Sequence, residues 1–332
     1  MCLPPAALLP VANRALLSHA LDWLGEAGVR EAVVVTPEDL AAEARSAARA
    51  SDGVRSLSWL EQSCDETLAH ALGELAGFTE GEPFIMHLAD SIARERLEAV
   101  IPDGAEDEAE VLLLVDEATR VGVADVVQVY TTGRADRVTR RRVRHEPAGV
   151  AILTGHAIED AIEVDAPPEH ILEALADRVE NRGGRVDTYS VGSWWRFRGG
   201  ADALLEGNRF ALEAVRPDYR RARLVDATIQ GAVIAHPEAH IESTTVRGPA
   251  VIGARAHLRD AYLGPYTSVG EDVVIDGAEV EHSIILSGAS ITHLGGRLEA
   301  SIVGPNARVF HDFRLPRALR LNLGEGAEVC LG

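Results

Sequence analysis

The spacing of apolar and polar residues changes along the chain and divides it into two parts. In the first part, apolar residues recur at helical spacing in some segments, such as 14–28, and form short unbroken runs in others, such as Glu31–Thr36 (EAVVVT). Such buried strands, alternating with helices, favour a parallel sheet covered on both faces, and the chain beyond residue 105 continues as mixed α/β. We therefore predict a mixed-sheet α/β domain over residues 1–222.

In this first part, one predicted strand is followed directly by a residue of chemical interest, Asp90. Ligands of α/β sheets lie at the carboxyl ends of strands, and Asp90 follows directly after such a strand. It is either a metal ligand or the N-cap of the next helix, and the sequence leaves both open. We expect helices at 14–28, 38–50, 66–75, 156–162, 168–179 and 201–215, and strands at 31–36, 55–60, 84–88, 111–115, 123–130, 150–153 and 185–191.

From about Arg223, aliphatic residues recur about every sixth position, with small residues and glycine between them. This period matches a hexapeptide β-helix, in which each short strand puts one aliphatic side chain into a triangular core and three strands make one coil. Some steps are five residues, and a sandwich of short strands is the alternative. We predict a β-helix domain over residues 223–332, with these core positions: Ile241, Val246, Ile252, Leu258, Leu263, Val269, Ile275, Val280, Ile285 and Ile291.

Composition narrows the classes of partner. The net charge of −20 disfavours nucleic acid and anionic membranes, and no apolar run reaches the roughly 18 residues of a membrane span. The apolar N-terminus has no basic region before it, and the three cysteines are far apart, so we expect a cytoplasmic protein without a disulfide framework. All 32 basic residues are arginine. No step that needs a lysine ammonium group can therefore use a residue of this chain.

Several segments carry a resemblance to a known family: LLPVANRALLSHALDWLGEAGV, LEQSCDETLAHAL, FIMHLADSI and WWRFRGGADALLEGNRFAL, together with the β-helix. With them, the chain resembles the sugar-1-phosphate nucleotidyltransferases, most closely the long glucose-1-phosphate thymidylyltransferases. The resemblance covers nearly the whole length. It implies a Rossmann-like nucleotidyltransferase domain followed by a left-handed hexapeptide β-helix.

The resemblance also implies a reaction and a set of site residues. The family joins a sugar 1-phosphate to a nucleoside triphosphate and releases pyrophosphate, which requires backbone donors, cationic side chains and Mg²⁺ held by carboxylates. Asp90 falls on the family's metal site. No residue is assigned a catalytic role. The positions implied for the nucleotide are Gln62, Thr67 and Asp90, and those implied for the sugar phosphate are Glu146, Gly149, Trp195, Arg196 and Phe197.

The chain departs from the family pattern in several places, and keeps Gln62 although a family glycine beside it falls near Thr67. The family's glycine loop and first strand would lie before Pro5, so either another segment fills the place of that strand or the true N-terminus is longer. A family lysine falls on Ala6, and a Glu-Lys-Pro segment is reduced to Glu146 and its proline. The second metal carboxylate falls on Phe197, next to Arg196, a cation that would repel the metal.

Three hypotheses remain. We favour a homologue that is silent in nucleotidyl transfer and acts as a binding, scaffolding or regulatory subunit, with weak affinity for a nucleotide or sugar phosphate. The first alternative is an active transferase that makes a nucleoside diphosphate sugar with Mg²⁺. The second is a repurposed enzyme or a β-helix acyltransferase using His257, His282 or His293 as the base. A homo-oligomer is expected, and a hetero-oligomer with an active paralogue is possible.

Overall fold

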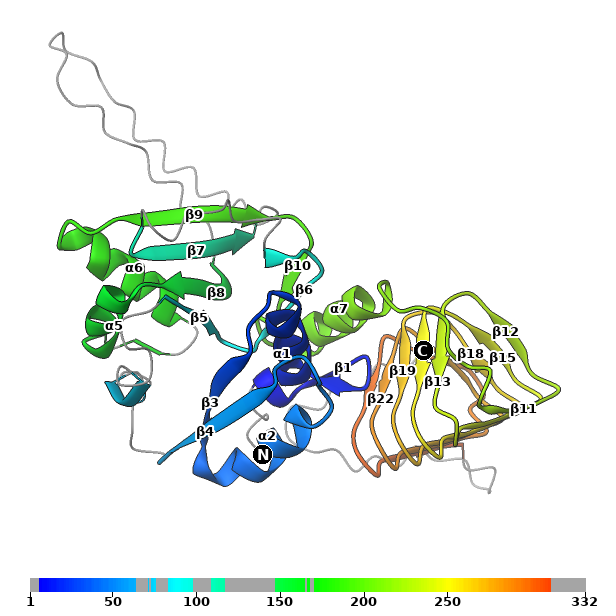
Figure 1. Cartoon of the computed structure of the whole chain (residues 1–332). Coiled ribbons are helices and arrows are strands. Elements are labelled where there is room, and N and C mark those ends of the chain that lie inside the picture. Colours follow the sequence, from blue (N-terminus) through cyan, green and yellow to red (C-terminus); the bar gives the residue numbers. More distant parts are fainter. Residues whose placement is uncertain are drawn as a thin grey trace, which may run out of the picture. The chain divides into compact units, whose positions relative to one another are not determined.

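The computed structural model divides the chain into two compact units, Leu17–Arg196 and Met1–Leu16 with Phe197–Gly332 (Figure 1). It describes residues 6–63, 71, 73–75, 83–97, 109–116, 147–164, 166–167 and 170–311. Of the predicted helix at 66–75, only 71 and 73–75 are described, and they are helical. The predicted strand at 123–130 lies outside the described residues. The boundary between residues 222 and 223 stays a prediction.

A four-stranded mixed sheet forms the centre of the Leu17–Arg196 unit, in the order β5-β8-β7-β9. β8 runs antiparallel to both of its neighbours, whereas β7 and β9 are parallel. The sheet is therefore mixed and not wholly parallel. The aliphatic residues of β7 and most of those of β8 are almost inaccessible to solvent, because apolar clusters cover both faces of the sheet. The four strands are β5 (Phe84–His87), β7 (Val111–Asp116), β8 (Pro147–Leu153) and β9 (Val186–Val191).

A second, separate sheet in this unit consists of β3 (Glu31–Pro37) and β4 (Ser56–Gln62), which run parallel. Among the described residues, β3 is hydrogen-bonded only to β4, and β5 only to β8. The apolar residues of β3, expected to be buried, are only partly buried. Within the described residues, β3 therefore has one strand neighbour where a central strand has two, and its side chains are less covered than those of β7. Helices α1 (Leu16–Glu26) and α2 (Ala41–Ala48) belong to the same part of the chain.

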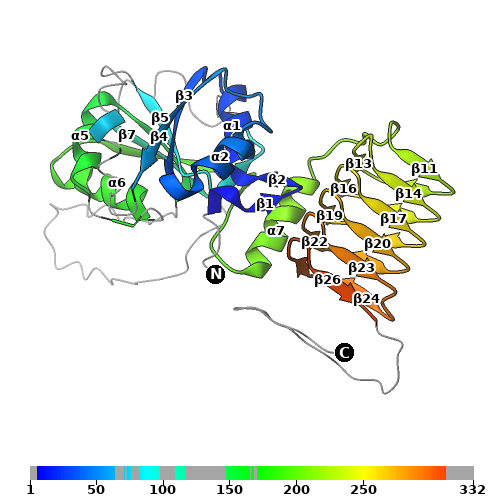
Figure 2. The ribbon, with the colours of Figure 1, turned by 90° about the horizontal axis from the view of Figure 1, so that it is seen from below.

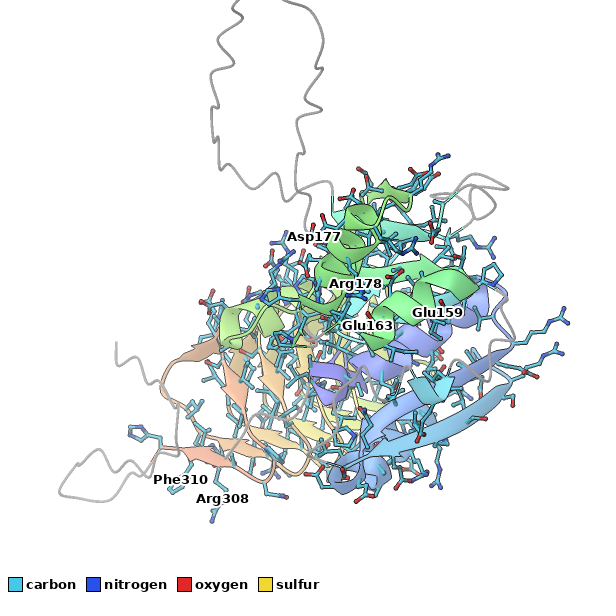
Figure 3. The ribbon with its side chains drawn as sticks, turned by 90° about the vertical axis from the view of Figure 1, so that its left-hand side faces the viewer. Glu159, Glu163, Asp177, Arg178, Arg308 and Phe310 are labelled. Carbon is cyan, nitrogen blue, oxygen red and sulfur yellow. The ribbon has the colours of Figure 1, made fainter. Side chains whose placement is uncertain are left out.

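Two helices pack on the mixed sheet, α5 (Gly155–Ile162) and α6 (Ile171–Asn181). Ion pairs join them: Arg178 contacts both Asp160 and Glu163, and Arg182 binds Asp160 with 2.6 Å between Nε and Oδ2. Figure 3 shows Arg178 of α6 beside Glu163, which directly follows α5. Asp160 is buried, so its two arginines supply the partners that a buried carboxylate requires.

The other unit contains a parallel β-solenoid, whose coils lie side by side in Figure 2. Successive coils pair in register: Ile241 lies opposite Leu258, which lies opposite Ile275. These inward-facing side chains are fully buried and form one continuous core, as the sequence period predicts.

The solenoid has three sheets, one for each face. The first contains β11 (Arg223–Val225), β14 (His240–Glu242), β17 (His257–Arg259), β20 (Val274–Asp276), β23 (Ser290–Thr292) and β26 (Arg308–Phe310). The second contains β12 (Thr228–Gln230), β15 (Thr245–Arg247), β18 (Tyr262–Leu263), β21 (Glu279–Glu281) and β24 (Arg297–Glu299). The third contains β13 (Val233–Ala235), β16 (Ala250–Ile252), β19 (Thr267–Val269), β22 (Ile284–Ile285) and β25 (Ile302–Val303).

A short N-terminal hairpin and helix α7 (Ala201–Leu212) belong to the solenoid unit. The hairpin pairs β1 (Pro10–Val11) with β2 (Arg14–Ala15). Asn208, which is fully buried, connects the parts: its Oδ1 accepts hydrogen bonds from Ala12 N at 2.9 Å and Ser268 Oγ at 2.6 Å. Its Nδ2 donates to the carbonyl oxygen of Tyr266 at 3.1 Å. One amide side chain thus ties together the hairpin, α7 and the solenoid.

The described helices include none that is long and apolar enough to cross a membrane.

Candidate functional site

The candidate site lies where β6 (Ser91–Ala93) pairs antiparallel with β10 (Trp194–Arg196). The register places Arg196 opposite Ser91, directly beside Asp90. Asp90 precedes a strand and not a helix, so its interpretation as a helix N-cap is wrong. The structure thus brings together Asp90 and Arg196, two of the residues singled out in the sequence.

Asp90 and Arg196 form a buried ion pair. Arg196 Nε lies 2.7 Å from Asp90 Oδ2, and Arg196 Nη1 donates to the carbonyl oxygen of Pro147 at 3.0 Å. The side chains are only 12% and 9% exposed, respectively. At this depth each charge requires the other, since an unpaired buried charge is strongly unfavourable. The negative charge of Asp90 is thus neutralised by a side chain of the chain itself.

Gly149 lies against this pair. The pairing of β7 with β8 shifts register between Leu113 and Val115, and Gly149 lies in the irregular part of β8 with a φ of 88°. A Cβ atom built on Gly149 would lie 2.5 Å from Asp90 Oδ1 and 3.3 Å from Arg196 Nε. The glycine is therefore required both by the backbone conformation and by the space that the ion pair fills.

Substitution Gly149→Ala should destabilise the Leu17–Arg196 unit more than the matched substitution Gly183→Ala. Gly183 has a φ of 93°, but a Cβ there would meet nothing within 4 Å. Gly183→Ala should lower the free energy of unfolding by about 1–2 kcal/mol through backbone strain alone. Gly149→Ala should lower it by roughly 1–3 kcal/mol more, because the added Cβ overpacks the site. Urea unfolding followed by tryptophan fluorescence measures both. Equal losses would show that Gly149 is not packed against Asp90.

An aromatic cluster adjoins the ion pair. The ring of His87 lies 5.7 Å from that of Trp23 and 6.4 Å from that of Trp194, centroid to centroid. His87 Nδ1 accepts a hydrogen bond from Ala89 N at 2.8 Å, which leaves the proton of the neutral ring on Nε2. Burial, together with the charge of Arg196, lowers the pKa of His87 to about 3. His87 is therefore neutral and not a proton shuttle near neutral pH.

The lowered pKa of His87 predicts a pH dependence of stability. Between pH 6.5, the ordinary pKa, and about pH 3, the unfolded chain binds the proton and the folded chain does not. The free energy of unfolding should thus fall as the pH falls through this window, by up to about 1.4 kcal/mol per pH unit from this group. His87→Asn keeps an acceptor for Ala89 N but cannot titrate. Urea unfolding at pH 7.0, 6.0 and 5.0 should give a shallower decline for the variant, and parallel declines would contradict the assignment.

Magnesium does not fit the residues described at this position. Mg²⁺ prefers octahedral coordination by carboxylate and water oxygens, and a neighbouring guanidinium repels it. Asp90 already binds Arg196. Within the described ranges, no group of three or more His, Cys, Asp or Glu residues could hold a metal ion. We therefore derive no chemical step through a metal here.

The other predicted site residues are dispersed or outside the described residues. Gln62 ends β4, opposite Pro37 of β3, in a sheet separate from the pair of β6 and β10. Trp195 is buried and lies opposite Ile92. Phe197 follows Arg196 in the chain and begins the other compact unit. Two predicted residues, Thr67 and Glu146, lie outside the described residues.

Sequence reasoning missed three residues of the site: His87, Ser91 and Trp194. Trp194 lies on the same face of β10 as Arg196, because side chains alternate along a strand, and its Nε1 donates to the carbonyl oxygen of Ala148 at 2.7 Å. Because residues two apart on a strand share a face, the alternation could have indicated that Trp194, and not Trp195, lies on the side of Arg196. The contact of His87 with Trp23 joins residues far apart in sequence, and no local sequence pattern predicts it.

The three histidines proposed for an acyltransferase lie at separate places on the solenoid. His257 lies on β17, with its ring centroid 5.6 Å from that of His240. His282 and His293 adopt positive φ angles at bends between strands, and the ring of His282 lies edge-on to that of Tyr266. This arrangement does not join the three into one site.

No family model matches the chain. It is 31% identical to the glucose-1-phosphate thymidylyltransferase of Streptomyces griseus over 330 residues, covering 96% of this chain and 91% of the relative. The corresponding enzyme of Streptomyces antibioticus is 27% identical, with 97% and 92% covered. The low-salt glycan biosynthesis nucleotidyltransferase of Haloferax volcanii is 29% identical, with 98% and 94% covered. Given this similarity along almost the whole length, the chain belongs to the sugar-1-phosphate nucleotidyltransferase family.

Proposed function

We propose that this chain is a member of the family that is silent in nucleotidyl transfer and acts as a binding or regulatory subunit. The observation that carries the proposal is the buried pair of Asp90 and Arg196. Transfer to a triphosphate needs divalent and side-chain cations aimed at the phosphates. Here the carboxylate is engaged by a guanidinium, and lysine is absent from the sequence.

The relatives suggest which ligands to examine. Two of them are named for glucose 1-phosphate and a thymidylyl group. We propose residual affinity for a nucleotide or a sugar phosphate, without turnover, and self-association or association with an active relative. The positions for such a ligand remain those that the family resemblance implies around Gln62, Gly149 and Arg196.

Release of pyrophosphate tests the proposal. The purified chain is incubated with glucose 1-phosphate, Mg²⁺ and each of dTTP, UTP, ATP, CTP and GTP, beside the Streptomyces griseus enzyme as a positive control. Each lost cationic or metal contact is worth several kcal/mol, and about 1.4 kcal/mol corresponds to a factor of ten in rate. We expect rates at least about 10³-fold below the control with every nucleotide. Turnover near that of the control would contradict the proposal.

A further inference from the structure

Two oxygen atoms bind the guanidinium of Arg196, and the Ser91 hydroxyl lies close to the same point beside Gly149. Asp90 supplies a carboxylate and Pro147 a backbone carbonyl, both hydrogen-bonded to the guanidinium. Ser91 adds a hydroxyl that is buried and has no hydrogen-bond partner among the described residues. A Cβ built on Gly149 would lie 3.3 Å from Arg196 Nε and 3.4 Å from Ser91 Oγ, so these groups lie around one point.

These oxygens match a planar cation with several donors. A guanidinium is charged at every relevant pH and presents its N–H groups in one plane, whereas an ammonium group or a metal ion does not. Burial strengthens the attraction between the carboxylate and such a cation and makes an empty site unfavourable.

We propose that Asp90, Ser91 and Pro147 form a buried cation site that the chain fills with its own Arg196, and that this site takes a free guanidinium-class cation when the side chain is shortened. The arginine thereby acts as an internal ligand that closes the site to soluble cations. The proposal does not depend on whether the chain is silent in nucleotidyl transfer: pyrophosphate release near that of the control would contradict the proposed function and leave the cation site untouched.

Chemical rescue of Arg196→Ala tests this proposal. The probe is N-ethylguanidinium, which restores the atoms that the substitution removes. All four tryptophans, Trp23, Trp59, Trp194 and Trp195, lie in the Leu17–Arg196 unit, so thermal unfolding followed by tryptophan fluorescence reports on that unit. We expect about 10 mM probe to raise the midpoint of the variant by roughly 2–4 °C, with saturation, and to leave the wild-type chain unchanged.

Matched controls separate this site from a general effect of the probe. Arg182→Ala removes another arginine that binds two carboxylates in the same unit, but Arg182 is 40% exposed. Arg182→Ala should show no rescue, because water reaches that position and the buried Asp160 keeps its ion pair with Arg178. Ethylammonium carries the same charge without the planar donors and should not rescue Arg196→Ala. Rescue by MgCl₂ equal to that by N-ethylguanidinium, or no rescue by either, would overturn the proposal.

A second measurement covers the case in which Arg196→Ala does not fold. In the wild-type chain labelled with ¹⁵N at arginine Nε, the Arg196 N–H should exchange with water at least about ten-fold more slowly than exposed arginines, because it is buried and bonded to Asp90. Arg196→Lys identifies the resonance by its loss, and Asp90→Asn should abolish the slow exchange. Fast exchange in the wild-type chain would overturn the proposal.

Discussion

Replacing Arg196 by alanine should lower the free energy of unfolding of the Leu17–Arg196 unit by about 3–5 kcal/mol. The loss arises because the substitution leaves the Asp90 carboxylate buried without its counter-charge and removes the donor to Pro147. Urea unfolding followed by tryptophan fluorescence measures the effect. An intact ion pair between such buried groups adds little net stability, so the effect reports what happens when one partner is removed.

Two comparison variants make the prediction specific. Asp90→Asn keeps an oxygen acceptor for Arg196 but leaves the guanidinium, which cannot lose its charge, buried without a counter-charge, and should also lose about 3–5 kcal/mol. Arg182→Ala breaks ion pairs to Glu110 and Asp160, but the buried Asp160 keeps its second partner Arg178. Pairs of an arginine that is 40% exposed typically contribute about 1 kcal/mol or less. If Arg196→Ala were no more harmful than Arg182→Ala, the pair of Asp90 and Arg196 would not be the buried pair described here.

Asn208→Ala should destabilise the solenoid unit by about 2–4 kcal/mol. The substitution removes the acceptor of Ala12 N and Ser268 Oγ and the donor to the Tyr266 carbonyl, all at a fully buried position. Each buried polar group left without a partner costs about 1–3 kcal/mol. The hairpin is most affected, because Ala12 has a strained φ of 49°. Hydrogen exchange read by mass spectrometry should show faster exchange across residues 6–16.

Ser268→Ala is the matched control for Asn208→Ala. It removes one donor to Asn208 Oδ1 and leaves the bond from Ala12 N in place. Ser268→Ala should lower the free energy of unfolding by about 1 kcal/mol and leave hydrogen exchange of the hairpin nearly unchanged. An equal effect of the two variants would show that Asn208 does not join the hairpin to the solenoid.

The regular elements could be predicted from sequence because their cause is local. The solenoid core follows from the spacing of residues such as Ile241, Leu258 and Ile275, which lie in register on successive coils. The strand expected at 84–88 occurs as Phe84–His87, and the helix expected at 156–162 occurs as Gly155–Ile162. Apolar periodicity determines such elements wherever one face is buried.

The site could be predicted only in part because its contacts are long-range. Sequence resemblance indicated Asp90 and Arg196, but their ion pair joins residues 106 positions apart and depends on the pairing of β6 with β10. The contact between Ala12 and Asn208 spans 196 positions. Burial of β3 was overestimated because an apolar run indicates a strand but does not show how many strands flank it.

The central claim is that the guanidinium of Arg196, and not a divalent cation, neutralises Asp90. Titration of Mn²⁺ followed by electron paramagnetic resonance, with wild-type chain and Asp90→Asn side by side, tests it most directly. Mn²⁺ also binds weakly to the many surface carboxylates of a chain with net charge −20, and the comparison cancels that background. We predict superimposable binding curves. A Mn²⁺ ion bound by the wild-type chain and lost in Asp90→Asn would contradict the claim.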